Sequence, residues 1–134
     1  MTDDYEYSSD WVSGVAPVWR SMISSVAPRR ALEIGAFEGR SAVFMIEHCA
    51  PLGPFEITCI DTWGSGPEYG GVNWADVEAR FDRNIARAKA KHANSTVQKI
   101  KSDSVSALAN LIAQGQAGVT TSPMSMGRTK RLMC

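Results

Sequence analysis

The segment ALEIGAFEGRSA, residues 31–42, holds two glycines four positions apart, with a glutamate before and after the first of them. Glycine allows the backbone to turn sharply and lets a ligand approach the main chain without a Cβ atom in the way. A helix that opens directly after such a turn presents unpaired N–H groups at its first residues. Gly35 and Gly39 therefore predict a small-molecule site at a strand-to-helix turn.

The spacing of the glycines indicates the class of ligand. A dinucleotide-binding turn reads G-x-G-x-x-G, whereas the pattern E-x-G-x-x-x-G lacks the middle glycine that admits a pyrophosphate. Glu33 and Glu38 would repel phosphate groups and could attract a cationic ligand. A nucleotide-dependent oxidoreductase on a related sheet is therefore disfavoured.

Polar residues also follow an apolar run at residues 55–60 and a weaker strand candidate at residues 96–101. They are Asp61, Thr62 and Trp63 after the first segment, and Ser102, Asp103 and Ser104 after the second. An acid about 20 residues or slightly more beyond a glycine turn is a general ribose-binding device, which supports Asp61. Each group alone would more often be a turn or a helix cap, but three groups in order favour a site.

The periodicity of the chain predicts the elements that position these groups. Helices are expected over residues 17–26, 41–47, from Trp74 onward and from Val105 to Gly115, and strands over 31–34, 55–60 and 96–101. The order is a helix followed by three strand–helix units, so we expect the α/β class with a parallel sheet. All three polar groups then lie at the carboxyl ends of strands, where ligands bind in such sheets.

With these features the sequence resembles the class I S-adenosylmethionine (SAM)-dependent methyltransferases. Within them it resembles a small-molecule methyltransferase family with the run LEIGxxEGRSA, which residues 32–42 match. The resemblance covers roughly residues 12–115. It implies a Rossmann-like parallel sheet with helices on both faces, of which only the N-terminal half, about three βα units, is present. It also implies SAM as cofactor and a small-molecule methyl acceptor.

The resemblance also assigns site residues. Those expected to hold the methionine and ribose portions of SAM are Glu33, Gly35, Ala36, Phe37 and Gly39, with Asp61 on the ribose hydroxyls and Ser102, Asp103 and Ser104 beside the adenine. Trp63, next to Thr62, either stacks on the adenine or closes the core. No catalytic base is assigned.

The amino-acid composition indicates which classes of binding partner are disfavoured. Fourteen basic and fourteen acidic residues give a formal net charge of +0, which argues against a dedicated nucleic-acid binder. The apolar runs are too short for a membrane helix, and the acidic start lacks the positive region of a secretory signal, so we expect a cytoplasmic protein. Three cysteines without metal-ligand spacing predict no metal site.

The last residues follow no apolar period. We expect residues 1–115 to be the N-terminal cofactor-binding half of a methyltransferase domain, and residues 116–134 to be a non-native or disordered tail. Members of the resembled family continue with a strand of the type YDFxYVDGxH. Codons permitted for GVTTSPMSMGRTKRLMC can be read in a shifted frame as RDDFAYVDGAHKAADV, so our hypothesis is a frameshift near residues 115–118. Codons in the coding DNA that are incompatible with FAYVDGAH in the shifted frame would contradict this hypothesis.

A half sheet leaves an open edge and uncovered apolar faces, so an insoluble, molten or inactive chain is the expected consequence. The leading hypothesis is thus a SAM-dependent methyltransferase by descent. The alternative is a non-catalytic truncated module that binds a nucleoside or a partner chain. The open edge also offers a place for self-association.

Overall fold

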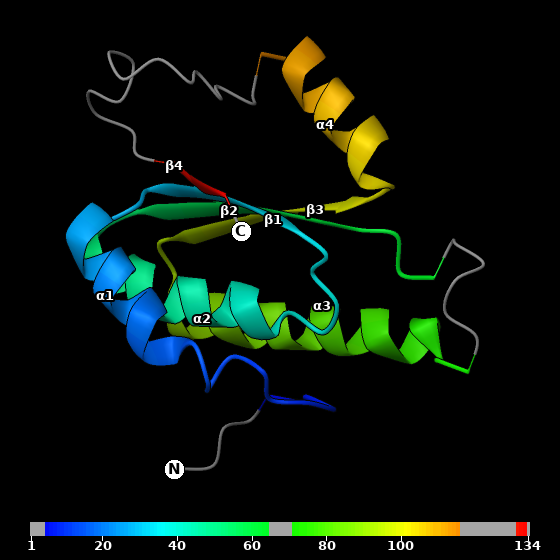
Figure 1. Ribbon diagram of the computed structural model, residues 1–134, viewed down its shortest axis with the longest axis horizontal. Coiled ribbons are helices and arrows are strands. Elements are labelled where there is room, and N and C mark those ends of the chain that lie inside the picture. Colours follow the sequence, from blue (N-terminus) through cyan, green and yellow to red (C-terminus); the bar gives the residue numbers. More distant parts are fainter. Residues whose placement is uncertain (1–4, 65–70, 116–130, 134) are drawn as a thin grey trace.

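The computed structural model describes residues 5–64, 71–115 and 131–133 of the 134-residue chain. Its elements (Figure 1) are α1 (Ala16–Val26), β1 (Arg30–Ile34), α2 (Arg40–Cys49), a 3₁₀ turn η1 (Ala50–Leu52), β2 (Phe55–Asp61), α3 (Trp74–Lys91), β3 (Ser95–Lys101), α4 (Ser104–Ala113) and β4 (Arg131–Met133). The predicted order of one helix and three βα units is confirmed up to α4.

The strands form a parallel sheet in the order β3-β2-β1-β4. The register pairs Ile34 of β1 with Ile60 of β2, and Ile60 with Ile100 of β3. The carboxyl ends of the three longer strands therefore lie side by side. The predicted Rossmann-like parallel sheet, with helices on both faces, is confirmed for this partial fold.

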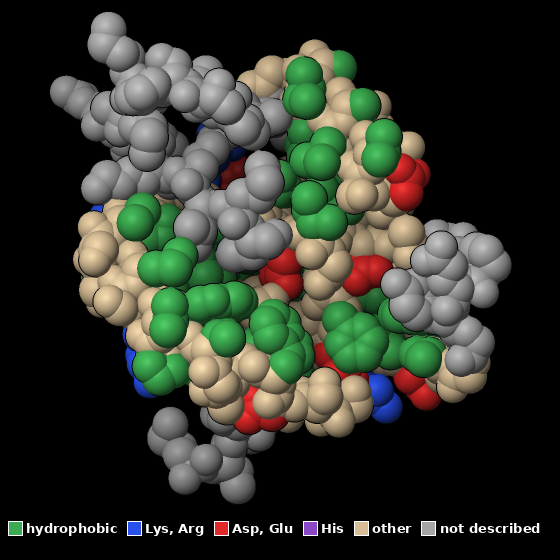
Figure 2. Space-filling view, in the orientation of Figure 1, with side chains coloured by type: hydrophobic (Ala, Val, Ile, Leu, Met, Phe, Trp, Pro, Cys, Tyr) green, Lys and Arg blue, Asp and Glu red, His purple; other side chains and the backbone are tan. Residues whose placement is uncertain are grey.

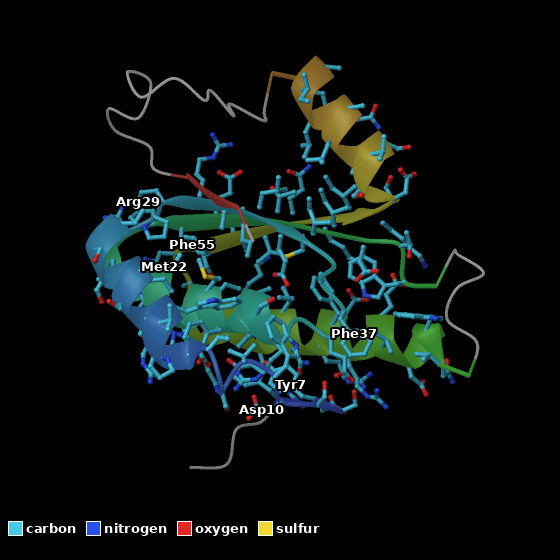
Figure 3. The ribbon with its side chains drawn as sticks, viewed as in Figure 1. Tyr7, Asp10, Met22, Arg29, Phe37 and Phe55 are labelled. Atoms are coloured by element: carbon cyan, nitrogen blue, oxygen red, sulfur yellow. The ribbon has the colours of Figure 1, made fainter. Side chains whose placement is uncertain are left out.

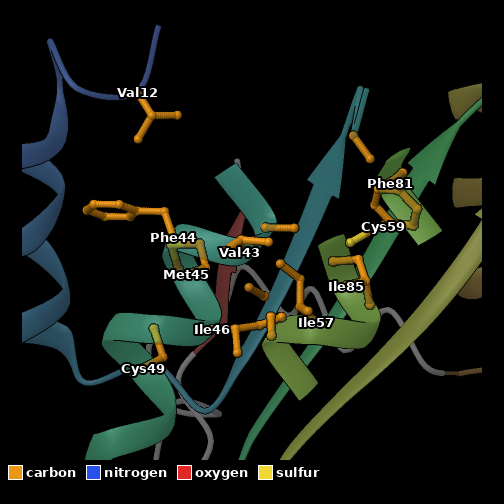
Figure 4. Close-up of a cluster of buried hydrophobic side chains, with 14 of the residues drawn as sticks. Val12, Val43, Phe44, Met45, Ile46, Cys49, Ile57, Cys59, Phe81 and Ile85 are labelled. Carbon is orange, nitrogen blue, oxygen red and sulfur yellow. The ribbon is translucent and has the colours of Figure 1, made fainter. Parts of the chain in front are cut away.

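The two faces of the sheet are covered unequally. Figure 1 shows α1, α2 and α3 on one face and α4 alone on the other. The larger apolar cluster packs α2 and α3 on the sheet through side chains such as Ile46, Ile57 and Phe81 (Figure 4), all at most 1% exposed. The smaller cluster is centred on Ile60 and Leu111. Most of the buried apolar surface therefore supports β1, β2 and the segments that leave them.

Local sequence explains where the helices begin. Pro17 lies in the first turn of α1, where its missing N–H removes no helical hydrogen bond. Asn73 caps α3 by accepting a hydrogen bond from Asp76 N, and Asp103 caps α4 in the same way from Ser106 N. None of the described helices is long and apolar enough to cross a membrane.

Large apolar side chains remain exposed on α1 and α4. Val18 and Met22 of α1 are 62% and 42% exposed, and Val105 and Ile112 of α4 are 77% and 67% exposed. Figure 2 shows hydrophobic side chains gathered over both helices.

Strand β4 lies within the segment that the sequence predicted to be a tail. Arg131 pairs with Arg30, and Met133 pairs with Leu32. Residues 116–130 and 134 lie outside the described residues. The division of the chain at residue 115 therefore stays a prediction.

Candidate functional site

The glycine loop, residues 35–39, joins β1 to α2. Gly35 and Gly39 have φ values of +83° and +84°, and Phe37 between them has a φ of 49°. A Cβ atom on Gly39 would lie 3.1 Å from Cδ2 of Phe81, whereas one on Gly35 would meet nothing within 4 Å. The loop is therefore tight against the core at Gly39 and open at Gly35.

Asp61 connects the end of β2 to this loop. Its Oδ2 accepts a hydrogen bond from Phe37 N at 2.8 Å, and its Oδ1 accepts one from Trp63 N at 2.9 Å. Gly35 N also donates to the main-chain oxygen of Ile60 at 2.8 Å. The predicted proximity of the glycine loop and the acid after β2 is therefore present in the structure. Ala36, also in the predicted set, is 2% exposed within the same loop.

The side chain of Trp63 lies in the core. It is 4% exposed and packs against Phe81, with ring centroids 4.8 Å apart, while its indole Nε1 donates to Phe37 O at 2.9 Å. Of the two roles left open for Trp63, the structure favours closure of the core over stacking on a ligand. Thr62 beside it is only partly buried.

Glu33 is a buried acid beneath the loop, 3% exposed on β1. Its Oε1 accepts a hydrogen bond from the Ser41 hydroxyl, while its Oε2 has no hydrogen-bond partner among the described residues. Burial raises the pKa of Glu33 to about 8; the Ser41 hydrogen bond acts against this rise and the charge of Asp61 adds to it. Glu33 therefore retains a proton at neutral pH when nothing else contacts it.

Ser41 is a site residue that the sequence analysis missed. It is 4% exposed in the first turn of α2, where the neighbouring buried residues Ala42 and Val43 are apolar. A hydroxyl on the buried side of such a helix was the available signal, because a buried polar group requires a partner.

Glu38 lies in the loop, but its side chain is directed toward Ser8 and Arg80. It is 1% exposed, its Oε2 accepts from Arg80 at 2.9 Å, and its Oε1 accepts from Ser8. The expectation that Glu38 attracts a cationic ligand is therefore not supported, because the carboxylate of Glu38 already pairs with the guanidinium of Arg80 in α3. Glu33 is the acid of the pair with an oxygen left over.

The polar side chains at the end of β3 make different contacts from those at the ends of β1 and β2. Ser102 N donates to Asp61 O at 2.9 Å, which brings this segment beside β2. The side chains, however, serve the local turn, because Asp103 caps α4 and the Ser102 hydroxyl donates to Asp103 O. Asp103 is exposed, and Ser104 is the first residue of α4.

Comparison with known protein families identifies the matched segment. A family of proteins described as a methyltransferase domain matches residues 32–121. The chain belongs to this family. No curated protein matches the chain.

The matched residues of this methyltransferase domain run from β1 through the glycine loop and the ends of β2 and β3. Class I methyltransferases of this kind generally use SAM. The matched range therefore includes the glycine loop and Asp61, which the structure brings into contact. Among the described residues, no group of three His, Cys, Asp or Glu side chains could hold a metal ion.

Proposed function

We propose that the glycine loop and Asp61 bind SAM, and that the chain belongs to an enzyme that transfers the SAM methyl group to a small molecule. The observation that carries the proposal is the convergence of Glu33 and Asp61 on one loop in the segment matched to the methyltransferase family. Both acids lie at the carboxyl ends of adjacent parallel strands, where ligands bind in this class of fold.

The residues fit the chemistry of SAM, which carries a sulfonium and an amino group but no phosphate. The Oε2 atom of Glu33 is buried and has no partner among the described residues, so a cationic donor would satisfy it. The open space at Gly35 leaves room for a ligand against the main chain. A phosphate-bearing cofactor would instead meet the carboxylate of Asp61.

Asp61 is suited to hold the ribose. Each of its oxygens accepts one main-chain N–H, from Phe37 or Trp63, and a carboxylate oxygen can accept a second hydrogen bond. The ribose hydroxyls would supply these donors. Gly35, Ala36, Phe37 and Gly39 would line the methionine and ribose portions, and the segment 102–104 would lie beside the adenine.

SAM, when bound, supplies an electrophilic methyl group. The contribution of the protein is to fix the orientation of the cofactor and acceptor and to exclude water, because methyl transfer needs donor and acceptor in line. In this proposal Asp61 holds the loop and the ribose, and Glu33 contacts the cationic part of the ligand; neither moves a proton to the acceptor. The proposed acceptor is a small molecule, and a cytoplasmic location without nucleic-acid or membrane partners belongs to the same proposal.

A second function is favoured by the exposed side chains of α1 and α4. A non-catalytic module would use these surfaces and the edge beyond β4 to bind a second copy or another chain. An apparent mass that rises with concentration, together with no SAM binding, would support this module over the enzyme.

Calorimetric titration with SAM and with S-adenosylhomocysteine tests the proposal. We expect saturable binding of both ligands and no competition from NADH. Glu56→Gln is a suitable control, because Glu56 pairs with Arg30 at the opposite ends of the strands. No binding of either ligand by a soluble, folded chain would contradict the proposal.

A further inference from the structure

We propose that the N-terminal arm, residues 5–10, positions the glycine loop for cofactor binding by holding Glu38. This inference rests on the proposed SAM site and adds the arm to it. Figure 3 shows Tyr7 and Asp10 on the side of α2 and α3 that faces away from the sheet. From there the arm reaches the loop through one buried carboxylate.

The carboxylate of Glu38 is shared between the arm and α3. Its Oε1 accepts from Ser8 N at 2.8 Å and from the Ser8 hydroxyl at 2.9 Å. Its Oε2 accepts from Arg80 Nη1 at 2.9 Å. Since Glu38 is 1% exposed, these contacts replace water around a buried charge. Removing one partner of such a group is strongly unfavourable, so the contacts fix where Glu38 lies.

Asn84 of α3 joins the arm to the loop a second time. Its Nδ2 donates to Glu38 O at 2.8 Å and to Glu6 O at 3.1 Å, and its Oδ1 accepts from Glu6 N at 2.8 Å. Asn84 is fully buried. One amide side chain therefore contacts the main chain of both segments at once.

The loop residues on either side of Glu38 explain how the arm would reach the cofactor. Phe37 donates its N–H to Asp61 and accepts the indole N–H of Trp63. Gly39 lies close to Phe81, since a Cβ atom on Gly39 would be 3.1 Å from Cδ2 of Phe81. A shift of Glu38 would therefore move the same peptide groups that hold Asp61. The arm residues thus act as positioning residues.

Ion pairs at the surface keep the arm in place. Glu6 pairs with Arg83 at 2.7 Å, and Asp10 pairs with Arg40 at 3.1 Å. The Arg40 guanidinium also lies 5.0 Å from the centre of the Tyr7 ring. The arm is thereby attached to both α2 and α3, the two helices that flank the loop.

The test compares SAM affinity in Arg80→Met, Arg80→Lys and Ser8→Ala. Arg80→Met keeps most of the aliphatic stem but removes the charge, and we expect SAM to bind about 10-fold more weakly, since hydrogen bonds to charged groups are the strong ones. Ser8→Ala leaves the main-chain donor, so about a threefold loss is expected. Arg80→Lys should restore part of the affinity. Glu56→Gln is the matched control and should bind as the wild type does.

Amide hydrogen exchange gives a readout that a merely structural role would not move. We expect faster exchange in a peptide spanning residues 35–40 of Arg80→Met, while β1 and β2 exchange as in the wild type. Lower melting temperatures with unchanged SAM affinity and loop exchange would overturn the inference. If the wild type binds SAM and Asp61→Asn does not, but Ser8→Ala and Arg80→Met bind normally, only the inference fails. If the wild type does not bind SAM, the proposed function fails with it.

Discussion

The ends of β1 and β2 differ from the end of β3, although polar residues lie at or directly after all three strand ends. At the first two ends, Glu33 is buried and Asp61 holds the main chain of the glycine loop. At the third, Asp103 is exposed and its carboxylate caps α4 by accepting a hydrogen bond from Ser106 N. A polar residue at a strand end is therefore not enough to make a site. What distinguishes the first two ends is that Asp61 holds the glycine loop and that Glu33, next to the loop, has one oxygen without a partner among the described residues.

The largest effect is expected from Glu33→Gln, through the pH dependence of stability. The pKa of Glu33 is raised from 4.5 to about 8 in the folded state, so between these values the folded chain retains a proton that the unfolded chain loses. The folded state then binds more protons, and wild-type stability falls as pH rises from about 4.5 to about 8. Glutamine has no such proton, and it preserves an acceptor for the Ser41 hydroxyl.

Urea unfolding at about pH 5 and about pH 8 measures this difference. Glu33→Gln should gain stability relative to the wild type across this range, by more than about 2 kcal/mol and at most about 4–5 kcal/mol. Asp103→Asn is the matched variant from the other strand end. The pKa of Asp103 is lowered from 3.8 by its hydrogen bonds to Ser106, so the carboxyl is ionised in both the folded and the unfolded state between about pH 5 and about pH 8, and no change of its stability difference with pH is expected there. An equal stability difference for Glu33→Gln at both pH values would contradict the account.

A smaller effect is expected from Gly39→Ala. A left-handed φ of +84° disfavours any residue with a Cβ atom, and here the atom would also crowd Phe81. We expect a loss of about 2–3 kcal/mol in the free energy of unfolding. Gly35→Ala shares the φ penalty but has open space, so it should lose only about 1–2 kcal/mol. Equal losses for the two variants would show that Phe81 does not confine the loop.

The smallest effect is expected at the end of β3. Asp103→Ala removes the cap of α4 and should lower the free energy of unfolding by less than Gly35→Ala does. SAM affinity should stay within about twofold of the wild type, because the side chain serves the helix. A large loss of affinity without a loss of stability would place Asp103 in the site and remove the contrast between the strand ends.

The sequence predicted the strand ends because its signals there are local. Glycine turns, the apolar runs and the 3.6-residue period of α3 need only neighbouring residues to be recognised, and the order of elements up to α4 follows from them. The partners of Glu38 are distant, with Ser8 30 residues away and Arg80 42 residues away. No local pattern indicates such contacts, so the arm was not predicted.

The same reasoning applies to Trp63 and Ser41. The sequence left two roles open for Trp63 because its direction depends on Phe81 of a later helix. Ser41 was missed because its partner Glu33 lies on the preceding strand, beyond the loop. The pairing of Arg131–Met133 with β1 had no apolar period to indicate it, since only three residues take part.

The measurement that tests the central claim most directly is calorimetric titration of SAM into the wild type, Asp61→Asn and Asp103→Asn. Asp61→Asn keeps one acceptor oxygen but loses the charge that accepts from Phe37 and Trp63. We predict saturable binding to the wild type and to Asp103→Asn, and at least about 30-fold weaker binding to Asp61→Asn. Equal affinities for all three folded proteins would contradict the assignment of the site to the glycine loop and Asp61.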